Sequence, residues 1–186
     1  TQDPNGQPTD GIIRVNASSV TDYAQKGVTD LSFGDGTSDN ESELKAVSYW
    51  NNLDYYNVWV VNEINDNDGG SGTQGYAYYP NGGFEADYDG TIILHNAFGY
   101  DPDGTLGYNL KNYTNLNATL AHELGHALNL RHTFEGDEDG LACPSNIDCE
   151  NDGDLVCDTD PHSRDEGNCE DTGETCFGVG TDVADR

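Results

Sequence analysis

Residues 122–132 read His-Glu-Leu-Gly-His-Ala-Leu-Asn-Leu-Arg-His. In an α-helix, residues four apart lie above one another, about 6 Å apart along the axis, so His122 and His126 can direct two imidazole rings at one ion. Two such nitrogens are half of the ligand set of a tetrahedral zinc. Glu123 follows the first histidine, where its carboxylate can reach a metal-bound water without ligating the metal itself. The spacing therefore predicts a zinc site with a general base beside it.

A third histidine, His132, follows six residues after His126. A catalytic zinc takes three protein ligands and keeps an open position for water, which makes His132 the natural third ligand. Taken alone, His132 is also compatible with an ordinary surface residue. To reach the same ion, the chain must leave the helix between residues 128 and 132 and turn back. Because asparagine tolerates a positive φ best after glycine, we expect Asn129 at the helix end or just beyond it, with positive φ.

The residues before this motif alternate between strand-like and helix-like patterns. Leucines recur at helical spacing from 116 to 128, and Asn115 or Asn117 can cap that helix. Runs rich in Val, Ile and aromatic residues, bounded by turn signals, indicate strands. We expect an α/β (α+β) fold with a helix at 41–51 and strands at 12–15, 56–64, 76–79 and 91–94.

The charge balance limits the possible partners. Among 186 residues, 35 are acidic and 7 are basic, which gives a formal net charge of −28. Such a chain is repelled by the phosphates of nucleic acid and by an anionic membrane surface, so we expect neither as a partner and expect a cation instead. No run approaches the roughly 20 apolar residues of a membrane-spanning helix.

The composition changes at about residue 135, where apolar residues become rare and Asp, Gly and Cys frequent. All five cysteines lie between Cys143 and Cys176, which favours disulfides in an oxidising compartment. The chain does not begin with methionine, and a removed leader fits secretion. We therefore expect a secreted, extracellular protein whose C-terminal segment is irregular and stabilised by disulfides and ions.

With its flanks, the motif resembles the metzincin metallopeptidases, whose long zinc motif is His-Glu-x-x-His-x-x-Gly-x-x-His. Asn129 stands where that motif has glycine. Within this group, three further stretches make the chain similar to the pappalysin or cytophagalysin family: His-Thr-Phe at 132–134, Gly-Tyr-Ala-Tyr-Tyr-Pro at 75–80 and Gly-Asp-Leu-Val-Cys-Asp-Thr at 153–159. The resemblance runs from about residue 58 to 159.

The resemblance implies a secreted zinc endopeptidase with a mixed twisted sheet and an active-site helix. It implies zinc on His122, His126 and His132, with Glu123 as base, and protein or peptide substrates. It also makes one sheet edge the substrate strand, formed by Gly75, Tyr76, Ala77, Tyr78 and Tyr79. For the three tyrosines, plain strand packing is an equally good interpretation.

The C-terminal segment offers hard oxygen ligands and sulfur pairs. Related peptidases bind calcium near Asp154, Asp158 and Thr159, so we expect a Ca²⁺ site there, whereas we interpret 137–139 as a solvated acidic surface. The resemblance implies a disulfide between Cys149 and Cys176. Because Cys143 and Cys157 flank the same loop, we expect a second disulfide between them, which leaves Cys169 over.

We expect residues 1–186 to form one metallopeptidase catalytic domain, with an N-terminal subdomain at 1–134 and the start of a C-terminal subdomain at 135–186. Members of the family carry a methionine-containing turn under the zinc, and this chain has no methionine. We therefore expect a further C-terminal fragment of the same protein, linked through Cys169. The competing hypothesis is a non-catalytic, calcium-stabilised extracellular binding module with a structural zinc. Glu123 separates the two, because a structural zinc takes four protein ligands and needs no adjacent base.

Overall fold

The computed structural model describes residues 1–29, 40–80, 89–111, 118–136, 143–145 and 147–159. The chain divides into two compact units, Thr1–Leu128 and Asn129–Arg186, which we describe one at a time. The first unit holds every helix and strand of the described residues. The second unit consists of turns and irregular backbone where it is described.

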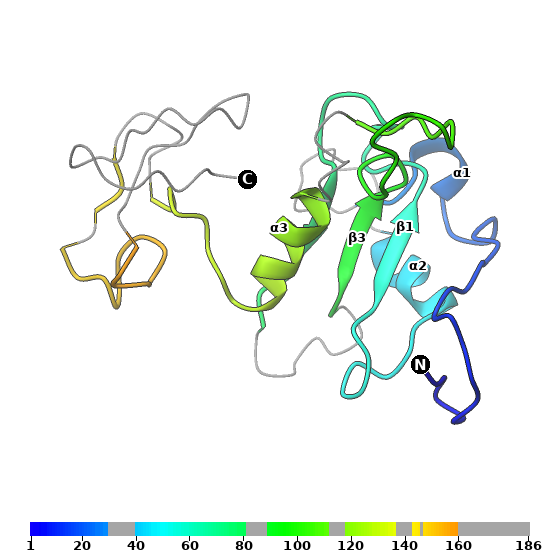
Figure 1. The fold of residues 1–186 in the computed structure, drawn as a ribbon, viewed down its shortest axis with the longest axis horizontal. Helices are drawn as coiled ribbons and strands as arrows, with labels where there is room; N and C mark the ends of the chain where they lie inside the picture. The colour runs from blue at the N-terminus through cyan, green and yellow to red at the C-terminus, as the bar shows by residue number, and fades with distance from the viewer. Residues whose placement is uncertain (30–39, 81–88, 112–117, 137–142, 146, 160–186) are drawn as a thin grey trace. The chain divides into compact units, whose positions relative to one another are not determined.

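A three-stranded mixed sheet forms the centre of the first unit (Figure 1). Its strands are β1 (Val58–Val61), β2 (Gly75–Ala77) and β3 (Thr91–Leu94), in the order β1-β3-β2. β1 runs parallel to β3, and β2 runs antiparallel to it. All four residues of β3 are buried, as expected for a central strand that is covered on both faces. The predicted α+β class with a small mixed sheet is confirmed.

Three helices accompany the sheet: α1 (Tyr23–Lys26), α2 (Glu41–Val47) and α3 (Ala118–Ala127). Figure 1 shows α3 beside β3, with α2 on the side of β1. The helix predicted at 41–51 ends at Val47, because Ser48 takes an extended conformation with φ −160° and ψ 113°. Beyond it, the Asn57 side chain bonds both the N–H and the carbonyl of Trp50, so that residue is held outside the helix.

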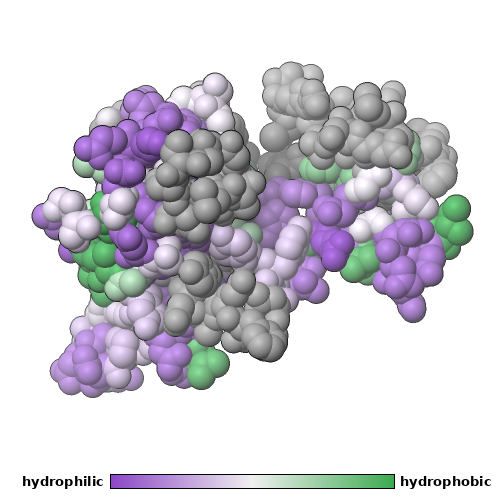
Figure 2. Space-filling model, turned by 180° about the vertical axis from the view of Figure 1, so that it is seen from behind, coloured by the Kyte–Doolittle hydropathy of each residue, from purple (hydrophilic) through white to green (hydrophobic). Residues whose placement is uncertain are grey.

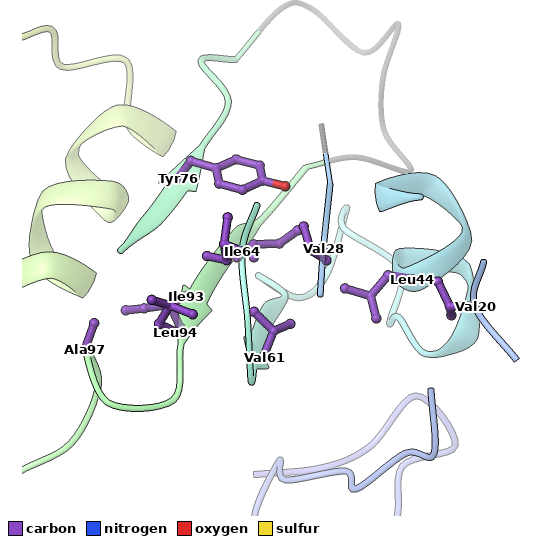
Figure 3. Close-up of a cluster of buried hydrophobic side chains, with 10 residues drawn as sticks. Val20, Val28, Leu44, Val61, Ile64, Tyr76, Ile93, Leu94 and Ala97 are labelled. Atoms are coloured by element: carbon purple, nitrogen blue, oxygen red, sulfur yellow. The ribbon is translucent and has the colours of Figure 1, made fainter. Parts of the chain in front are cut away.

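The hydrophobic core lies against the sheet and receives side chains from the N-terminal segment, α2, the strands and the loop after β3 (Figure 3). Ile64, Ile92, Ile93 and Leu94 have no exposed surface. The full set of buried hydrophobic residues is Val20, Val28, Leu44, Val61, Ile64, Tyr76, Ile92, Ile93, Leu94 and Ala97. Side chains far apart in the sequence therefore share one core within the first unit.

The strand predicted at 12–15 does not form, and this prediction is wrong. Ile12, Ile13 and Val15 are 61%, 52% and 47% exposed. Just before them, the N–H of Gly11 bonds the Thr9 hydroxyl and the N–H of Ile12 bonds the Asp10 carboxylate. These local side-chain bonds compete with strand pairing, and an apolar run without a partner strand has nothing to pack against.

The surface in the view of Figure 2 is mostly hydrophilic over the described residues, with separate hydrophobic side chains between the polar ones. This pattern agrees with the acidic composition. Among the described residues, no helix is both long enough and apolar enough to cross a membrane.

Gly75 of β2 stands at a position where a side chain has no room beside the central strand. It pairs with Ile93 of β3. A Cβ at Gly75 would lie 2.9 Å from the carbonyl oxygen of Ile92, 3.4 Å from Cγ1 of Ile93 and 3.5 Å from Cγ of Glu123. The nearest of these atoms belongs to the backbone of the central strand and cannot move aside cheaply. Space therefore requires a glycine here, because a side chain would conflict with the backbone of β3, whereas Glu123 of α3 would be at ordinary contact distance.

Replacing Ile92 by alanine should lower the free energy of unfolding by about 2–5 kcal/mol, because it empties a fully buried position. Ile12→Ala is the matched control and should stay within about 0.5 kcal/mol, because that side chain is exposed. Urea unfolding followed by circular dichroism measures both. Equal losses in the two variants would show that residues 12–15 belong to the core after all.

Gly75→Ala should destabilise the protein by about 1–3 kcal/mol, because the added methyl group overlaps the Ile92 carbonyl. Gly70→Ala is the control, since a Cβ there meets only the Asn67 side-chain oxygen, at 3.8 Å. We expect that variant to change the stability by less than about 0.5 kcal/mol. A Gly75→Ala protein with unchanged thermal and urea unfolding would contradict the close approach of Gly75 to the Ile92 carbonyl of β3.

Candidate metal centre

Two histidines on α3 direct their ring nitrogens at one point. The Nε2 atoms of His122 and His126 are 3.0 Å apart, and the two rings meet edge to face with centroids 4.6 Å apart. Two nitrogens that each bind a tetrahedral zinc at about 2.0–2.1 Å are about 3.3 Å from each other. The spacing of this pair therefore fits shared ligation of one ion. The helix supplies it through the four-residue offset predicted from the sequence.

The helix ends where the sequence predicts a turn. The N–H of Leu128 still bonds the carbonyls of Leu124 and Gly125, and Asn129 has a φ of 67°, in the left-handed region. The predicted positive φ of Asn129 is confirmed. Three residues later comes His132, and the ligand nitrogens of His122, His126 and His132 all lie within 4.8 Å of one another. The imidazole set that the motif predicts is thus present with the composition of a zinc site.

His132 has two neighbours in the second unit: Phe134, which belongs to the His-Thr-Phe stretch of the family resemblance, and Glu135, which the sequence did not single out. Its ring stacks on Phe134 with centroids 4.6 Å apart and an angle of 11°, and its Nδ1 lies 3.7 Å from a Glu135 oxygen. A carboxylate on this side favours a proton on Nδ1 and leaves Nε2 available for a metal. The spacing of three residues after the last histidine of the motif is the signal that could have identified Glu135.

Glu123 is buried between α3 and β2, with 7% of its surface exposed. Burial raises the pKa of its carboxyl, while the charge of His122 and a hydrogen bond from the backbone N–H of Ala77 lower it. A carboxyl in such surroundings, beside a pair of imidazoles, is typical of a functional site. Glu123 therefore stands as a carboxylate held next to the histidine pair, as the motif predicts, and β2 supplies one of its contacts.

β2 forms one edge of the sheet in the part of the chain that the structure describes, because it pairs only with β3 there. The tyrosines predicted to line this edge divide into two kinds. Tyr76 is buried in the core, and the Tyr78 hydroxyl donates to Glu41. The Tyr79 ring instead meets His126 edge to face, with centroids 5.2 Å apart. Core packing thus accounts for Tyr76, whereas Tyr79 lies at the histidine pair.

The disulfide pairing differs from the prediction. Cys149 bonds to Cys157, with their Cα atoms 4.9 Å apart, so both predicted pairs, Cys143 with Cys157 and Cys149 with Cys176, are wrong. The reason is local. A turn in which the N–H groups of residues 151 and 152 bond the carbonyl of residue 148 folds this short segment back on itself. Cys143 also forms a disulfide, and Cys169 and Cys176 lie outside the described residues.

The predicted calcium ligands show no metal-binding geometry of the kind found at the histidines. An oxygen of Asp154 accepts the N–H of Val156, and the N–H of Thr159 bonds the Val156 carbonyl. Among the described residues, the three histidines are the one group of at least three His, Cys, Asp or Glu side chains whose ligand atoms converge. Calcium at Asp154, Asp158 and Thr159 stays a prediction, and residues 137–139 lie outside the described part.

Comparison with known proteins places the chain among metallopeptidases. Residues 38–185 match peptidase family M43, described as pregnancy-associated plasma protein-A. An extracellular metalloprotease of Colletotrichum graminicola is 38% identical over 106 residues, which cover 55% of this chain and 32% of the relative. An extracellular metalloprotease of Sordaria macrospora is 30% identical over 124 residues, which cover 64% of this chain and 35% of that relative. The chain thus spans about a third of the length of these curated relatives.

A solved structure, Tannerella forsythia mature mirolysin in complex with a cleaved peptide, shares the fold. It aligns with a TM-score of 0.64 and 25% identity over 97% of this chain and 56% of the mirolysin chain. The family match covers most of the chain, and the histidine set converges as that chemistry requires. The chain belongs to peptidase family M43, the pappalysin family of metzincin zinc metallopeptidases.

Proposed function

We propose that this chain carries the catalytic centre of a secreted zinc endopeptidase in which Glu123 is the general base. The observation that carries the proposal is a buried Glu123 carboxyl that interacts with the charge of His122, one of two histidines whose Nε2 atoms are 3.0 Å apart. Family membership supports a peptidase, and the relatives are named extracellular metalloproteases. The alternative of a binding module with a structural zinc is not favoured, because the motif offers three histidines and a carboxylate rather than four protein ligands.

His122, His126 and His132 are the residues that would hold the zinc, leaving a fourth position for water and substrate. When bound, zinc lowers the pKa of that water towards neutrality and polarises the carbonyl of the peptide. The neutral imidazoles leave the positive charge of the ion uncompensated, which is what both effects require. Glu135 beside Nδ1 of His132 helps to orient that ligand.

Glu123 performs the proton transfers. Its carboxylate takes the proton of the attacking water and later delivers it to the leaving amine. The N–H of Ala77 holds the carboxylate in place, and burial keeps bulk water away from it. A base whose pKa is raised by burial is also a better proton acceptor than an exposed glutamate, which favours the first step.

The peptide substrate would lie extended along the edge of β2 that pairs with no other strand among the described residues. An edge strand presents unpaired backbone groups, so recognition there is backbone to backbone and side chains are read only through pockets. Mirolysin, the solved relative, was determined with a cleaved peptide. The position of Tyr79 beside His126, next to this edge, supports a peptide path that ends at the metal.

Glu123→Gln should leave zinc bound and lower peptide hydrolysis by at least about a hundredfold, because a positioned base typically contributes about 10² to 10⁴ in rate. The measurement pairs metal content by mass spectrometry with turnover of a quenched fluorescent peptide library. His95→Ala is the control, since this exposed histidine lies outside the motif, and it should change neither value. Full activity in Glu123→Gln protein with zinc bound would sink the catalytic assignment.

A further inference from the structure

A buried ion pair lies on α2, on the side of the sheet away from the histidines. Glu41 and Lys45 are one helical turn apart, their charged groups are 2.5 Å apart, and both side chains are 2% exposed. The Lys45 nitrogen also lies 5.0 Å from the ring centroids of Trp59 and Tyr78. Because desolvation offsets most of the attraction in such a pair, stability alone is a weak explanation for it. Its contacts suggest what it does instead.

Tyr78 connects this pair to the metal side of the sheet. Its hydroxyl donates to the second carboxylate oxygen of Glu41 at 2.8 Å, and its ring is one of the two beside the Lys45 nitrogen. A hydrogen bond to a charged acceptor is stronger and more directional than one between neutral groups. Both the ring and the hydroxyl of Tyr78 are therefore held by α2.

The two residues that flank Tyr78 in the sequence contact the helix that carries the histidines, α3. On one side, the N–H of Ala77 bonds the Glu123 carboxylate, and on the other, the Tyr79 ring meets His126. The side chains of Tyr78 and Tyr79 therefore contact different helices, α2 and α3, as expected for successive side chains that leave the backbone on opposite sides. The position of Tyr78 therefore sets the position of both neighbours.

We propose that Tyr78 is a positioning residue of the metal centre. The hydrogen bond from its hydroxyl to Glu41 fixes the position of residues 77–79. Ala77 then holds the Glu123 carboxylate, and the Tyr79 ring holds the ring of His126. The buried Glu41–Lys45 pair is then the rigid support of this segment. The inference rests on the proposed function for its effect on turnover, but its effect on the metal stands without it.

The test compares Tyr78→Phe, which removes only the hydroxyl, with Tyr49→Phe, an exposed tyrosine as control. Zinc affinity is measured in the whole chain by competition with a chromogenic chelator. We expect Tyr78→Phe to weaken zinc binding by about tenfold, the low end of the about 10- to 100-fold cost of losing an outer partner of a metal ligand, because Tyr78 acts on His126 only through Tyr79. Tyr49→Phe should stay within about twofold. In turnover, kcat should fall about tenfold in Tyr78→Phe while KM stays unchanged.

The outcomes separate the two proposals. Wild-type zinc affinity in folded Tyr78→Phe protein overturns the positioning role, and a lower melting temperature alone would assign Tyr78 to structure only. Weakened zinc in a chain without peptidase activity would uphold the positioning role and refute the proposed function. If Tyr78→Phe does not fold, Tyr79→Ala takes its place, since it removes the ring from His126 at a partly exposed position. Unchanged zinc affinity in that variant would also overturn the inference.

Discussion

The close packing of β2 on α3 is the constraint on which the site depends. Gly75 lies at this contact, where a Cβ would come within 2.9 Å of the Ile92 carbonyl oxygen in the central strand and 3.5 Å from Cγ of Glu123. The approach buries Glu123 and brings the Ala77 N–H to its carboxylate. It also places the Tyr79 ring on His126. The packing of β2 on α3 thus sets the surroundings of both the base and a ligand.

The same packing has an electrostatic cost that a metal would offset. A carboxyl with 7% of its surface exposed has lost most of its hydration, and its pKa is raised for that reason. The backbone donor and the neighbouring imidazole compensate for part of this loss. A divalent cation on the histidines adds a positive charge next to the same carboxylate. Zinc binding and the stability of the first unit are therefore linked, since a metal that binds only the folded chain stabilises it.

The sequence predicts the centre of the site well because its geometry is local. Helical spacing alone places His122 above His126, and the tolerance of asparagine for positive φ predicts the turn at Asn129. The strand at Thr91–Leu94 was found at its observed bounds, because a short run of a β-branched threonine and three apolar residues is typical of a central strand. In each case the determining interactions lie within a few residues of one another.

The features that the sequence did not predict depend on contacts between residues that lie far apart along the chain. The apolar run at 12–15 looks like a strand, but nothing in the sequence shows that it lacks a partner. The pairing of Cys149 with Cys157, eight residues apart, follows from a local turn that cysteine spacing does not reveal. Glu41 and Lys45 have the spacing of a helical ion pair, yet only the fold shows that the pair is buried under Tyr78. The role of Gly75 depends on two other elements meeting it.

The account rests on a zinc held by three histidines with one position left open. X-ray absorption at the zinc edge, recorded on the chain loaded with one equivalent of zinc, tests this most directly. Three nitrogen neighbours at about 2.0–2.1 Å and one further oxygen are expected, and His132→Ala should remove one nitrogen from that shell. A sulfur shell near 2.3 Å, four protein nitrogens, or a His132→Ala spectrum identical to that of the parent chain would contradict the account.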